Sequence, residues 1–293
     1  MANVEQVGLI GLGLVGKALA KCFIAANYGV IGYDIKEEAA NAARNAGVEV
    51  VSNPINVGKT CQLIFLSLPS SSIVDDVLWG EKGLAKFCGS NSTIIDTTTS
   101  DPKETIRHHQ LLAERGIRFI DCPLVGSSEE IANAQAVAIV GDTEEAAHYA
   151  HVLNTFSKKV FFLGELGQGH QTKLVVNLVL GLNRLVLSEG LGLAKKCGMN
   201  PSQVLEILKS SAAYSEVMDT QGEVMLTQKF NNPVARLAQH AKDVGLILEL
   251  ASETGARVPL SKLHNSLLKE AIEANWGTLD NSAVINLFIP TDK

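Results

Sequence analysis

The stretch GLGLVGKA, residues 11–18, decides the fold, because it matches two different nucleotide-binding turns. As G-x-G-x-x-G it lays the pyrophosphate of a dinucleotide on a helix N-terminus, and as G-x-x-x-x-G-K it is one residue short of a loop that binds ATP or GTP. The second loop needs Ser or Thr after the lysine, because that hydroxyl binds Mg²⁺. Ala18 has no oxygen to offer, so the stretch favours the dinucleotide turn.

The three glycines of this turn have separate tasks. Gly11 makes the tight turn, Gly13 lets the pyrophosphate approach the backbone, and Gly16 lets helix and strand pack closely. An apolar strand candidate, residues 7–10, precedes the turn and a helical pattern, residues 17–26, follows it, as anion binding at a helix N-terminus requires. The residues expected to line the pyrophosphate are Gly11, Leu12, Gly13, Leu14, Val15 and Gly16.

Asp34 supports this interpretation, because it ends the second strand candidate, residues 28–34, and lies 18 residues after Gly16. A carboxylate there accepts hydrogen bonds from both ribose hydroxyls of the adenosine half and repels a 2′-phosphate. The alternative is a solvated Asp at a strand end, but its place after the glycines favours the cofactor role. We therefore expect NAD rather than NADP, although Lys36 is close enough to soften that preference.

The composition excludes several classes of protein. The chain has 293 residues, enough for two domains, and its 25 basic and 31 acidic residues give a net charge of −6. A nucleic-acid-binding domain would show a basic stripe instead. Five scattered cysteines without a C-x-x-C pair predict a reduced chain with no structural metal.

Neither a membrane span nor a secretion signal is expected. The longest apolar region, residues 174–194, is interrupted by Asn177, Asn183, Arg184 and Glu189, which a membrane span rarely tolerates. The N-terminal MANVEQV lacks the basic and apolar blocks of a signal peptide. We therefore expect a buried helix in a cytoplasmic protein.

Strand and helix signals alternate over the first half of the chain, and only helical signals follow. The strand candidates are residues 5–10, 28–34, 48–51, 63–68, 92–96, 118–122, 135–141 and 159–163. The helical patterns from Gln168 onward are residues 168–197, 201–212, 235–255 and 259–276. Such alternation predicts an α/β, Rossmann-type, doubly wound and mostly parallel sheet over residues 1–164. An all-helical domain, residues 165–293, is expected to begin with a long helix.

Several stretches together resemble the β-hydroxyacid dehydrogenase family. They run in the order of the family over nearly the whole chain: residues 8–20, 68–69, 94–102, 121–127, 167–177 and 242–249. The resemblance implies a Rossmann domain joined by a long helix to a helical domain, with the active site in the cleft between them. It also implies a homodimer or homotetramer built through the helical domains.

Lys173 is the candidate catalytic residue, with Asn177 four residues later on the same helix face. Hydride transfer to a carbonyl leaves negative charge on oxygen, which an ammonium stabilises and protonates, and a neutral amine accepts that proton in the reverse direction. Burial on this apolar helix would favour the neutral amine. The residues alone equally allow a lysine that extends to solvent. The resemblance places the catalytic Lys and its partner Asn at these two positions.

Other site residues are implied by the resemblance alone. Lys242 matches a lysine that reaches the cofactor, and Asp243 lies near the substrate. Leu68 and Pro69 match a dipeptide against the cofactor riboses, and Thr99 matches a hydroxyl residue on the nicotinamide side. For Lys242 and Asp243, the alternative is an ordinary exposed Lys-Asp pair at a helix start. For the threonine, capping of the following helix is the alternative, and Thr98 or Ser100 could serve as well.

The substrate loop departs from the family pattern D-A-P-V-S-G-G. Val125 stands where the family has the Ser whose hydroxyl holds the substrate carboxylate. Gly126 still allows close backbone approach, and Ser127 and Ser128 supply hydroxyls slightly later in the chain. We therefore expect the acid group to lie deeper along this loop, or to be other than a simple carboxylate, a sulfonate being one example.

The expected function is transfer of a hydride between NAD(H) and a small anionic 3-hydroxy acid or semialdehyde. The histidines show no metal-ligand spacing, and no metal is expected. An imine reductase-like enzyme and a non-catalytic NAD-binding interaction protein are the alternatives, but such relatives generally lack the lysine found at Lys173. The particular substrate, the direction of reaction and the choice between dimer and tetramer are left open.

Overall fold

The structure, a computed structural model, describes residues 5–142 and 144–289. The chain divides into two compact units, Met1–Lys173 and Leu174–Lys293. The change of sequence pattern near Gly164 predicts a domain boundary before the long helix α8 (Gln168–Lys196), whereas the two compact units meet within that helix, after Lys173. The reason is that the first turn of α8 packs on the first unit, where Gly169 adjoins Asp121 and the carbonyl of Ile139.

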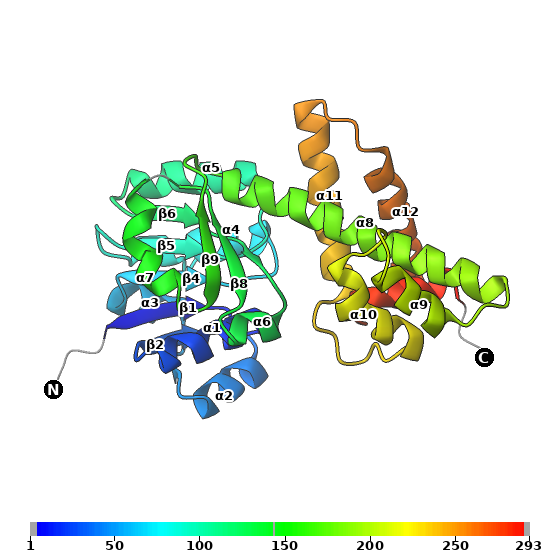
Figure 1. Cartoon of the computed structure of the whole chain (residues 1–293). Helices are drawn as coiled ribbons and strands as arrows, with labels where there is room; N and C mark the ends of the chain where they lie inside the picture. The colour runs from blue at the N-terminus through cyan, green and yellow to red at the C-terminus, as the bar shows by residue number, and fades with distance from the viewer. Residues whose placement is uncertain (1–4, 143, 290–293) are drawn as a thin grey trace. The chain divides into compact units, whose positions relative to one another are not determined.

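The first unit is built on a six-stranded parallel sheet (Figure 1). Its strand order is β3-β2-β1-β4-β5-β6, the order of a doubly wound nucleotide-binding fold. The strands are β1 (Gln6–Ile10), β2 (Gly29–Tyr33), β3 (Glu49–Val50), β4 (Leu63–Leu66), β5 (Thr93–Asp96) and β6 (Arg118–Asp121). Their runs of buried Val, Ile, Leu and Phe are typical of a sheet covered on both faces.

Both faces of this sheet carry a hydrophobic core. One core centres on Phe23 of α1, whose ring centroid lies 4.9 Å from that of Phe65, and Phe156 meets both rings edge-on. The opposite core gathers Ile64, Ile94 and other apolar residues. The helices of this unit are α1 (Leu14–Ala25), α2 (Glu37–Asn45), α3 (Pro54–Thr60), α4 (Ser71–Trp79), α5 (Pro102–Ala113), α6 (Ser128–Ala132) and α7 (Ala150–Leu153), with 3-10 turns η1 (Leu84–Lys86) and η2 (Glu144–Tyr149).

Two expected strands join a second sheet instead of the main one. β7 (Leu124–Val125), β8 (Ala136–Val140) and β9 (Ser157–Phe162) form a three-stranded sheet, with β7 and β8 antiparallel and β8 and β9 parallel. The strand signals at residues 135–141 and 159–163 were correct, but their membership of the main sheet was not. Alternation of apolar residues indicates a strand but does not indicate which strand it pairs with. β7 is too short to give a periodic signal.

The second unit contains helices only, apart from an isolated bridge between Arg236 and Asp280, over residues 174–289. After α8 come α9 (Pro201–Lys209), α10 (Glu216–Thr227), α11 (Leu237–Thr254), α12 (Pro259–Glu273) and a 3-10 turn, η3 (Asn281–Leu287). No helix was expected at the position of α10, whose apolar stripe is interrupted by Gly222. This glycine is required by packing, because a Cβ there would lie 2.8 Å from the Leu205 side chain.

Among the described helices, α8 is long and apolar enough to cross a membrane by length and composition, and 44% of its most apolar window is buried. The core helix of a soluble protein meets the same criterion, so this is weak evidence for a membrane span. Several apolar side chains of α8 are nevertheless exposed: Val175, Val179, Val186 and Leu193. They are spaced by four or seven residues and so follow one face of the helix.

The cysteines of the chain are free thiols. Cys22, Cys61 and Cys122 are buried, Cys88 is half-buried and Cys197 is exposed. Burial raises the pKa values of Cys61 and Cys88 to about 11, and it raises the pKa of Cys122 further. The buried thiols are therefore protonated and unreactive at neutral pH.

Candidate active site

The glycine-rich turn between β1 and α1 has the geometry that a dinucleotide requires. Gly11 has φ +92°, and a Cβ there would lie 2.2 Å from the carbonyl oxygen of Ser67. A Cβ on Gly16 would lie 1.9 Å from the carbonyl oxygen of Gly11. Gly13 faces open space within the described structure, with no atom within 4 Å of its virtual Cβ, and it is the N-cap of α1 without a side-chain cap. The surroundings of each glycine are compatible with its expected task, and the helix end without a side-chain cap has N–H groups that could bind an anion.

Asp34 follows β2 and is held against this turn. Its Oδ2 accepts the N–H of Leu12 at 2.7 Å, and its Oδ1 accepts the N–H of Lys36 at 2.8 Å. Each carboxylate oxygen retains a further lone pair that can accept a hydroxyl proton. Ile35 beside it is 86% exposed, so a large apolar side chain lies open next to the carboxylate. Sequence reasoning missed Ile35, although its place directly after Asp34 was a usable signal.

The ends of β4 and β5 are joined by threonine hydroxyls. Thr98 Oγ1 accepts the N–H of Leu68 at 3.1 Å, and Thr97 Oγ1 donates to the carbonyl of Leu66. The hydroxyl of Ser100 donates to Asp96. The hydroxyls of Thr98 and Ser100, the two alternatives to Thr99, are thus engaged within the protein. Thr99 is the most exposed of the three threonines. The capping explanation was wrong, because α5 is capped by Asp101, which accepts the N–H of Lys103.

Lys173 and Asn177 lie near the beginning of α8, and both are buried. Lys173 is 9% exposed and Asn177 is 6% exposed, so Lys173 does not extend to solvent. Because they are four residues apart on one helix, their side chains share a face. A buried lysine beside an amide is an unusual arrangement, since burying an ammonium is costly.

A chain of polar contacts in the second unit links Asn177 to α11. Asn177 Nδ2 donates to Asp243 Oδ2 at 2.9 Å, and Lys242 Nζ lies 2.9 Å from Asp243 Oδ1. Asp243 is buried and Lys242 is partly exposed. The structure therefore brings together three predicted residues, with the Asp243 carboxylate holding the amide and the ammonium.

The substrate loop ends in a capping box. The Ser127 Oγ accepts the N–H of Glu130 at 3.2 Å, and Glu130 Oε2 accepts the N–H of Ser127 at 2.7 Å. Gly126 has φ +141°, which favours glycine, and Val125 pairs with Val137 in the small sheet. The amide of Ser127 is thus engaged by a carboxylate, whereas its hydroxyl keeps a proton to donate. The signal for this box was the S-x-x-E pattern at residues 127–130.

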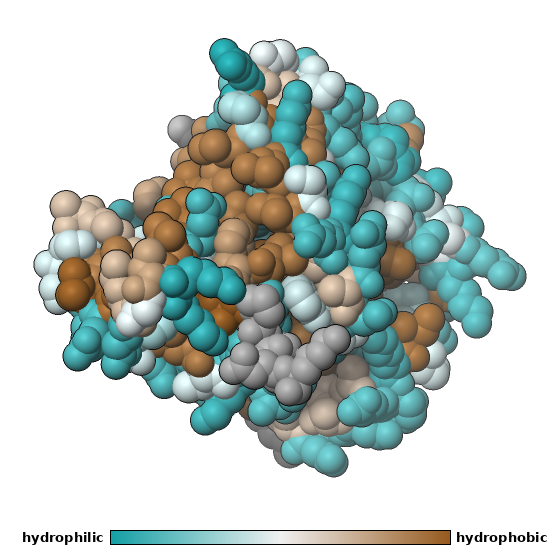
Figure 2. Space-filling model, turned by 90° about the vertical axis from the view of Figure 1, so that its right-hand side faces the viewer, coloured by the Kyte–Doolittle hydropathy of each residue, from teal (hydrophilic) through white to brown (hydrophobic). Residues whose placement is uncertain are grey.

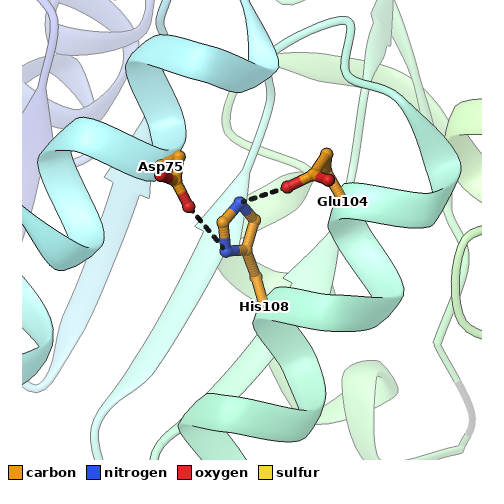
Figure 3. A group of neighbouring side chains, drawn as sticks. All are labelled: Asp75, Glu104 and His108. Atoms are coloured by element: carbon orange, nitrogen blue, oxygen red, sulfur yellow. Dashed lines mark ion pairs between the residues drawn. The ribbon is translucent and has the colours of Figure 1, made fainter.

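Asp75, Glu104 and His108 lie close together in the first unit, with possible ligand atoms within 4.8 Å of one another (Figure 3). The guanidinium of Arg107 bonds to both Asp75 and Glu104. His108 Nδ1 accepts the indole N–H of Trp79 at 2.9 Å, so that lone pair is already used. A metal ion held by both carboxylates would have to displace Arg107 from them. We therefore assign these residues to an ion-pair cluster around a neutral histidine.

Two buried histidines predict a loss of stability in acid. Burial lowers the pKa of His108 to about 4, and burial followed by the nearby Arg184 lowers the pKa of His264 to about 4. The folded state keeps both rings neutral below the ordinary value near 6.5, whereas the unfolded chain takes up protons there. Stability is therefore full above about pH 6.5 and falls as pH decreases toward 4, by about 2 kcal/mol per histidine at pH 5.

Urea unfolding at pH 7.5 and pH 5 measures this effect. His108→Gln is expected to reduce the difference between the two midpoints, and His151→Gln, at an exposed histidine, is expected to leave it unchanged. Equal pH dependence in His108→Gln and the unmodified chain would show that His108 does not contribute.

Comparisons with known proteins agree with this geometry. Residues 6–164 match the family described as the NAD binding domain of 6-phosphogluconate dehydrogenase, and residues 167–288 match that described as NAD-binding of NADP-dependent 3-hydroxyisobutyrate dehydrogenase. The chain belongs to the β-hydroxyacid dehydrogenase family. It is an NAD(P)-dependent dehydrogenase that acts on CH–OH groups.

Relatives of this β-hydroxyacid dehydrogenase match along its whole length. The 2-(hydroxymethyl)glutarate dehydrogenase of Eubacterium barkeri is 30% identical, over 98% of this chain and 96% of the relative. The glyoxylate/succinic semialdehyde reductase 1 of Arabidopsis thaliana is 27% identical, over 96% of this chain and 97% of the relative. The 3-hydroxyisobutyrate dehydrogenase of Mycobacterium tuberculosis, solved with L-serine, has a TM-score of 0.86 at 23% identity, covering 97% and 99% of the two chains.

The fold is shared more widely than the chemistry. An imine reductase from Pseudomonas sp. matches this dehydrogenase with a TM-score of 0.65 at 19% identity, covering 97% of this chain and 99% of that chain. Likeness at this level concerns the fold alone, so the reaction must be argued from residues.

Proposed function

We propose that this dehydrogenase transfers a hydride between NAD(H) and a small 3-hydroxy acid or semialdehyde, with Lys173 as the general acid and base. The observation that carries the proposal is the burial of Lys173 near the start of α8, beside Asn177. A buried amine that exchanges a proton with a reacting oxygen accounts for a lysine at a position where it is otherwise costly.

The residues of the glycine-rich turn would hold the cofactor. Gly11, Gly13 and Gly16 fit the pyrophosphate, and Asp34 fits the adenosine ribose. The exposed Ile35 would supply apolar contact to the adenine ring. The nicotinamide supplies or accepts the hydride when the cofactor is bound.

Lys173 would act on the oxygen of the substrate. In oxidation its neutral amine accepts the hydroxyl proton, and in reduction its ammonium stabilises the developing negative charge and returns the proton. Asn177 is fixed by Asp243 at 2.9 Å, so its amide oxygen is oriented and can accept a hydrogen bond from the Lys173 amine or from the substrate. Lys242 and Asp243 are proposed to serve cofactor and substrate as the family pattern implies.

Turnover of a substrate panel tests the proposal. The protein should oxidise one or more 3-hydroxy acids with NAD, or reduce the corresponding semialdehydes with NADH. Reduction of cyclic imines with no activity on semialdehydes would favour the imine reductase alternative, and cofactor binding without any turnover would favour a non-catalytic protein.

NAD is expected to be preferred over NADP because of Asp34. The carboxylate accepts ribose hydroxyls, and its negative charge repels a 2′-phosphate. We expect kcat/KM to be at least about tenfold higher with NADH than with NADPH, equivalent to about 1.4 kcal/mol. Asp34→Ala should narrow this ratio, whereas Glu38→Ala, at an exposed acid of α2, should not change it. Higher kcat/KM with NADPH in the unmodified protein would contradict the assignment.

We also propose that the protein is a homo-oligomer assembled through its helical unit. The exposed apolar face of α8 and the exposed Leu260 and Leu263 of α12 support this. Figure 2 shows hydrophobic surface gathered in a broad area of the face viewed. A second copy would remove this surface from water, which a soluble monomer rarely leaves exposed.

A further inference from the structure

The start of α8 is capped by a residue from a distant strand end. Asp121, the last residue of β6, is 0% exposed. Its Oδ1 accepts the N–H of Gly167 at 3.1 Å, and its Oδ2 accepts the N–H of His170 at 3.1 Å. These donors belong to the end of a helix whose first N–H groups have no partner within the helix. A carboxylate also interacts favourably with this positive end of the helix dipole.

The backbone at two glycines packs closely against this carboxylate. A Cβ on Gly141 would lie 2.3 Å from Asp121 Oδ2, and a Cβ on Gly169 would lie 2.6 Å from the same atom. The carbonyl of Asp121 also accepts the N–H of Gly141 at 3.0 Å. Both the main chain and the side chain of Asp121 are therefore fixed by packing.

His170 holds the same helical turn through its side chain. Its ring is 0% exposed, with Nδ1 2.7 Å from Thr105 Oγ1 and Nε2 3.9 Å from Asp96 Oδ2. Asp96 is the last residue of β5, the strand paired with β6. The ends of two neighbouring strands thus provide the carboxylates that surround the first turn of α8.

Lys173 follows His170 by three residues, which is less than one helical turn. We propose that Asp121 is a positioning residue for Lys173, holding the first turn of α8 so that the amine meets the reacting oxygen. The inference rests on the proposed role of Lys173. Asp121 also begins the substrate loop, residues 121–128, so its side chain connects that loop to the helical turn that precedes Lys173. A displacement of about 1 Å at a catalytic group can cost about 100-fold in rate.

Replacement of Asp121 by asparagine is the direct test. The amide oxygen can accept one N–H, but the amide nitrogen then faces the second N–H as another donor, so the first turn of α8 must shift. We expect kcat to fall about 100-fold, with the Kd for NADH within about threefold of the unmodified value.

Asp280→Asn provides the matched control. Asp280 is also buried and accepts two backbone N–H groups, those of Val234 and Ser282, but it belongs to the second unit, whereas the first turn of α8 belongs to the first. This variant should lose thermal stability as Asp121→Asn does, with kcat near the unmodified value. A similar loss of stability in both variants, with kcat unchanged in both, would overturn the proposal.

A double-mutant cycle separates positioning from general loss of structure. If Asp121 acts through Lys173, adding Asp121→Asn to Lys173→Ala should lower the residual rate of hydride transfer by less than about threefold. A further 100-fold loss in that background would show that Asp121 acts independently, and would overturn the proposal. Near-normal turnover by Lys173→Ala alone would instead remove the proposed function of Lys173, and the positioning role with it.

A milder variant keeps the test decisive if Asp121→Asn does not fold. Thr105→Val removes the hydroxyl that contacts His170 Nδ1 and leaves the Asp121 cap in place. It should lower kcat by about three- to tenfold, and this loss should also disappear in the Lys173→Ala background. Loss of the same size in both backgrounds would contradict the proposal.

Discussion

Replacing Lys173 by alanine is expected to lower kcat by about 1,000-fold while the Kd for NADH stays within about threefold. The amine acts on the reacting oxygen, whereas adenosine and pyrophosphate are held by the glycine-rich turn and Asp34. Single-turnover absorbance of NADH gives the rate of hydride transfer, and fluorescence titration gives the affinity. Lys195→Ala is the control, because Lys195 is an exposed lysine of the same helix.

An arginine at position 173 distinguishes the two tasks of the lysine. Arginine keeps the positive charge but does not release its proton in proteins. Lys173→Arg should therefore lose oxidation of the hydroxy acid as fully as Lys173→Ala does. Turnover by Lys173→Ala near that of Lys195→Ala would show that Lys173 has no part in the chemistry.

Substrate discrimination is the second large effect that we expect. Val125 offers no hydroxyl at the place where the family pattern has one, so 3-hydroxyisobutyrate and tartronate semialdehyde should be poor substrates. A substrate that leaves hydrogen-bonding groups unpaired can lose about 10⁴-fold in kcat/KM. We expect the best substrate to carry its acid group deeper along residues 125–128, or to carry another anionic group such as a sulfonate. Comparison of kcat/KM over carboxylate and sulfonate analogues measures this.

Variants of the loop identify the hydroxyl that holds the acid group. Val125→Ser should improve activity on the ordinary family acids, and Ser127→Ala or Ser128→Ala should raise KM for the best substrate. Ser127→Ala also removes the helix cap to Glu130, at a cost of about 1 kcal/mol in stability, so Ser128→Ala is the cleaner probe. Turnover of either family acid at the rate of the best substrate would contradict the prediction.

The parts of the fold that depend on local pattern could be predicted from the sequence. The glycine-rich turn follows from spacing alone, and Gly11, Gly13 and Gly16 have the surroundings that their spacing implied. The order of apolar strands and intervening helices sufficed for a parallel sheet, because right-handed crossovers restrict the connections. The sequence did not indicate which sheet β8 and β9 join, because strand pairing is set by contacts distant in the chain.

In the candidate site, too, local features could be predicted from the sequence, whereas contacts between distant residues could not. Lys173 and Asn177 could be placed on one helix face by their spacing. The bond from Asn177 to Asp243 joins residues 66 apart, and the cap on α8 joins Asp121 to residues 46 and 49 later. The periodicity of the sequence does not predict such contacts. The capping box of Ser127 and Glu130 was local, by contrast, and its sequence pattern could have revealed it.

The distribution of thiols makes the chain suitable for labelling at one position. Cys22, Cys61 and Cys122 are buried, and the thiol pKa of Cys88 is raised to about 11. Cys197 is exposed and directly follows α8, the helix whose beginning carries Lys173. A maleimide fluorophore would therefore attach to Cys197 selectively at neutral pH, because the reaction requires both the thiolate form and an accessible sulfur. Such a dye would report on α8 without the introduction of a new cysteine.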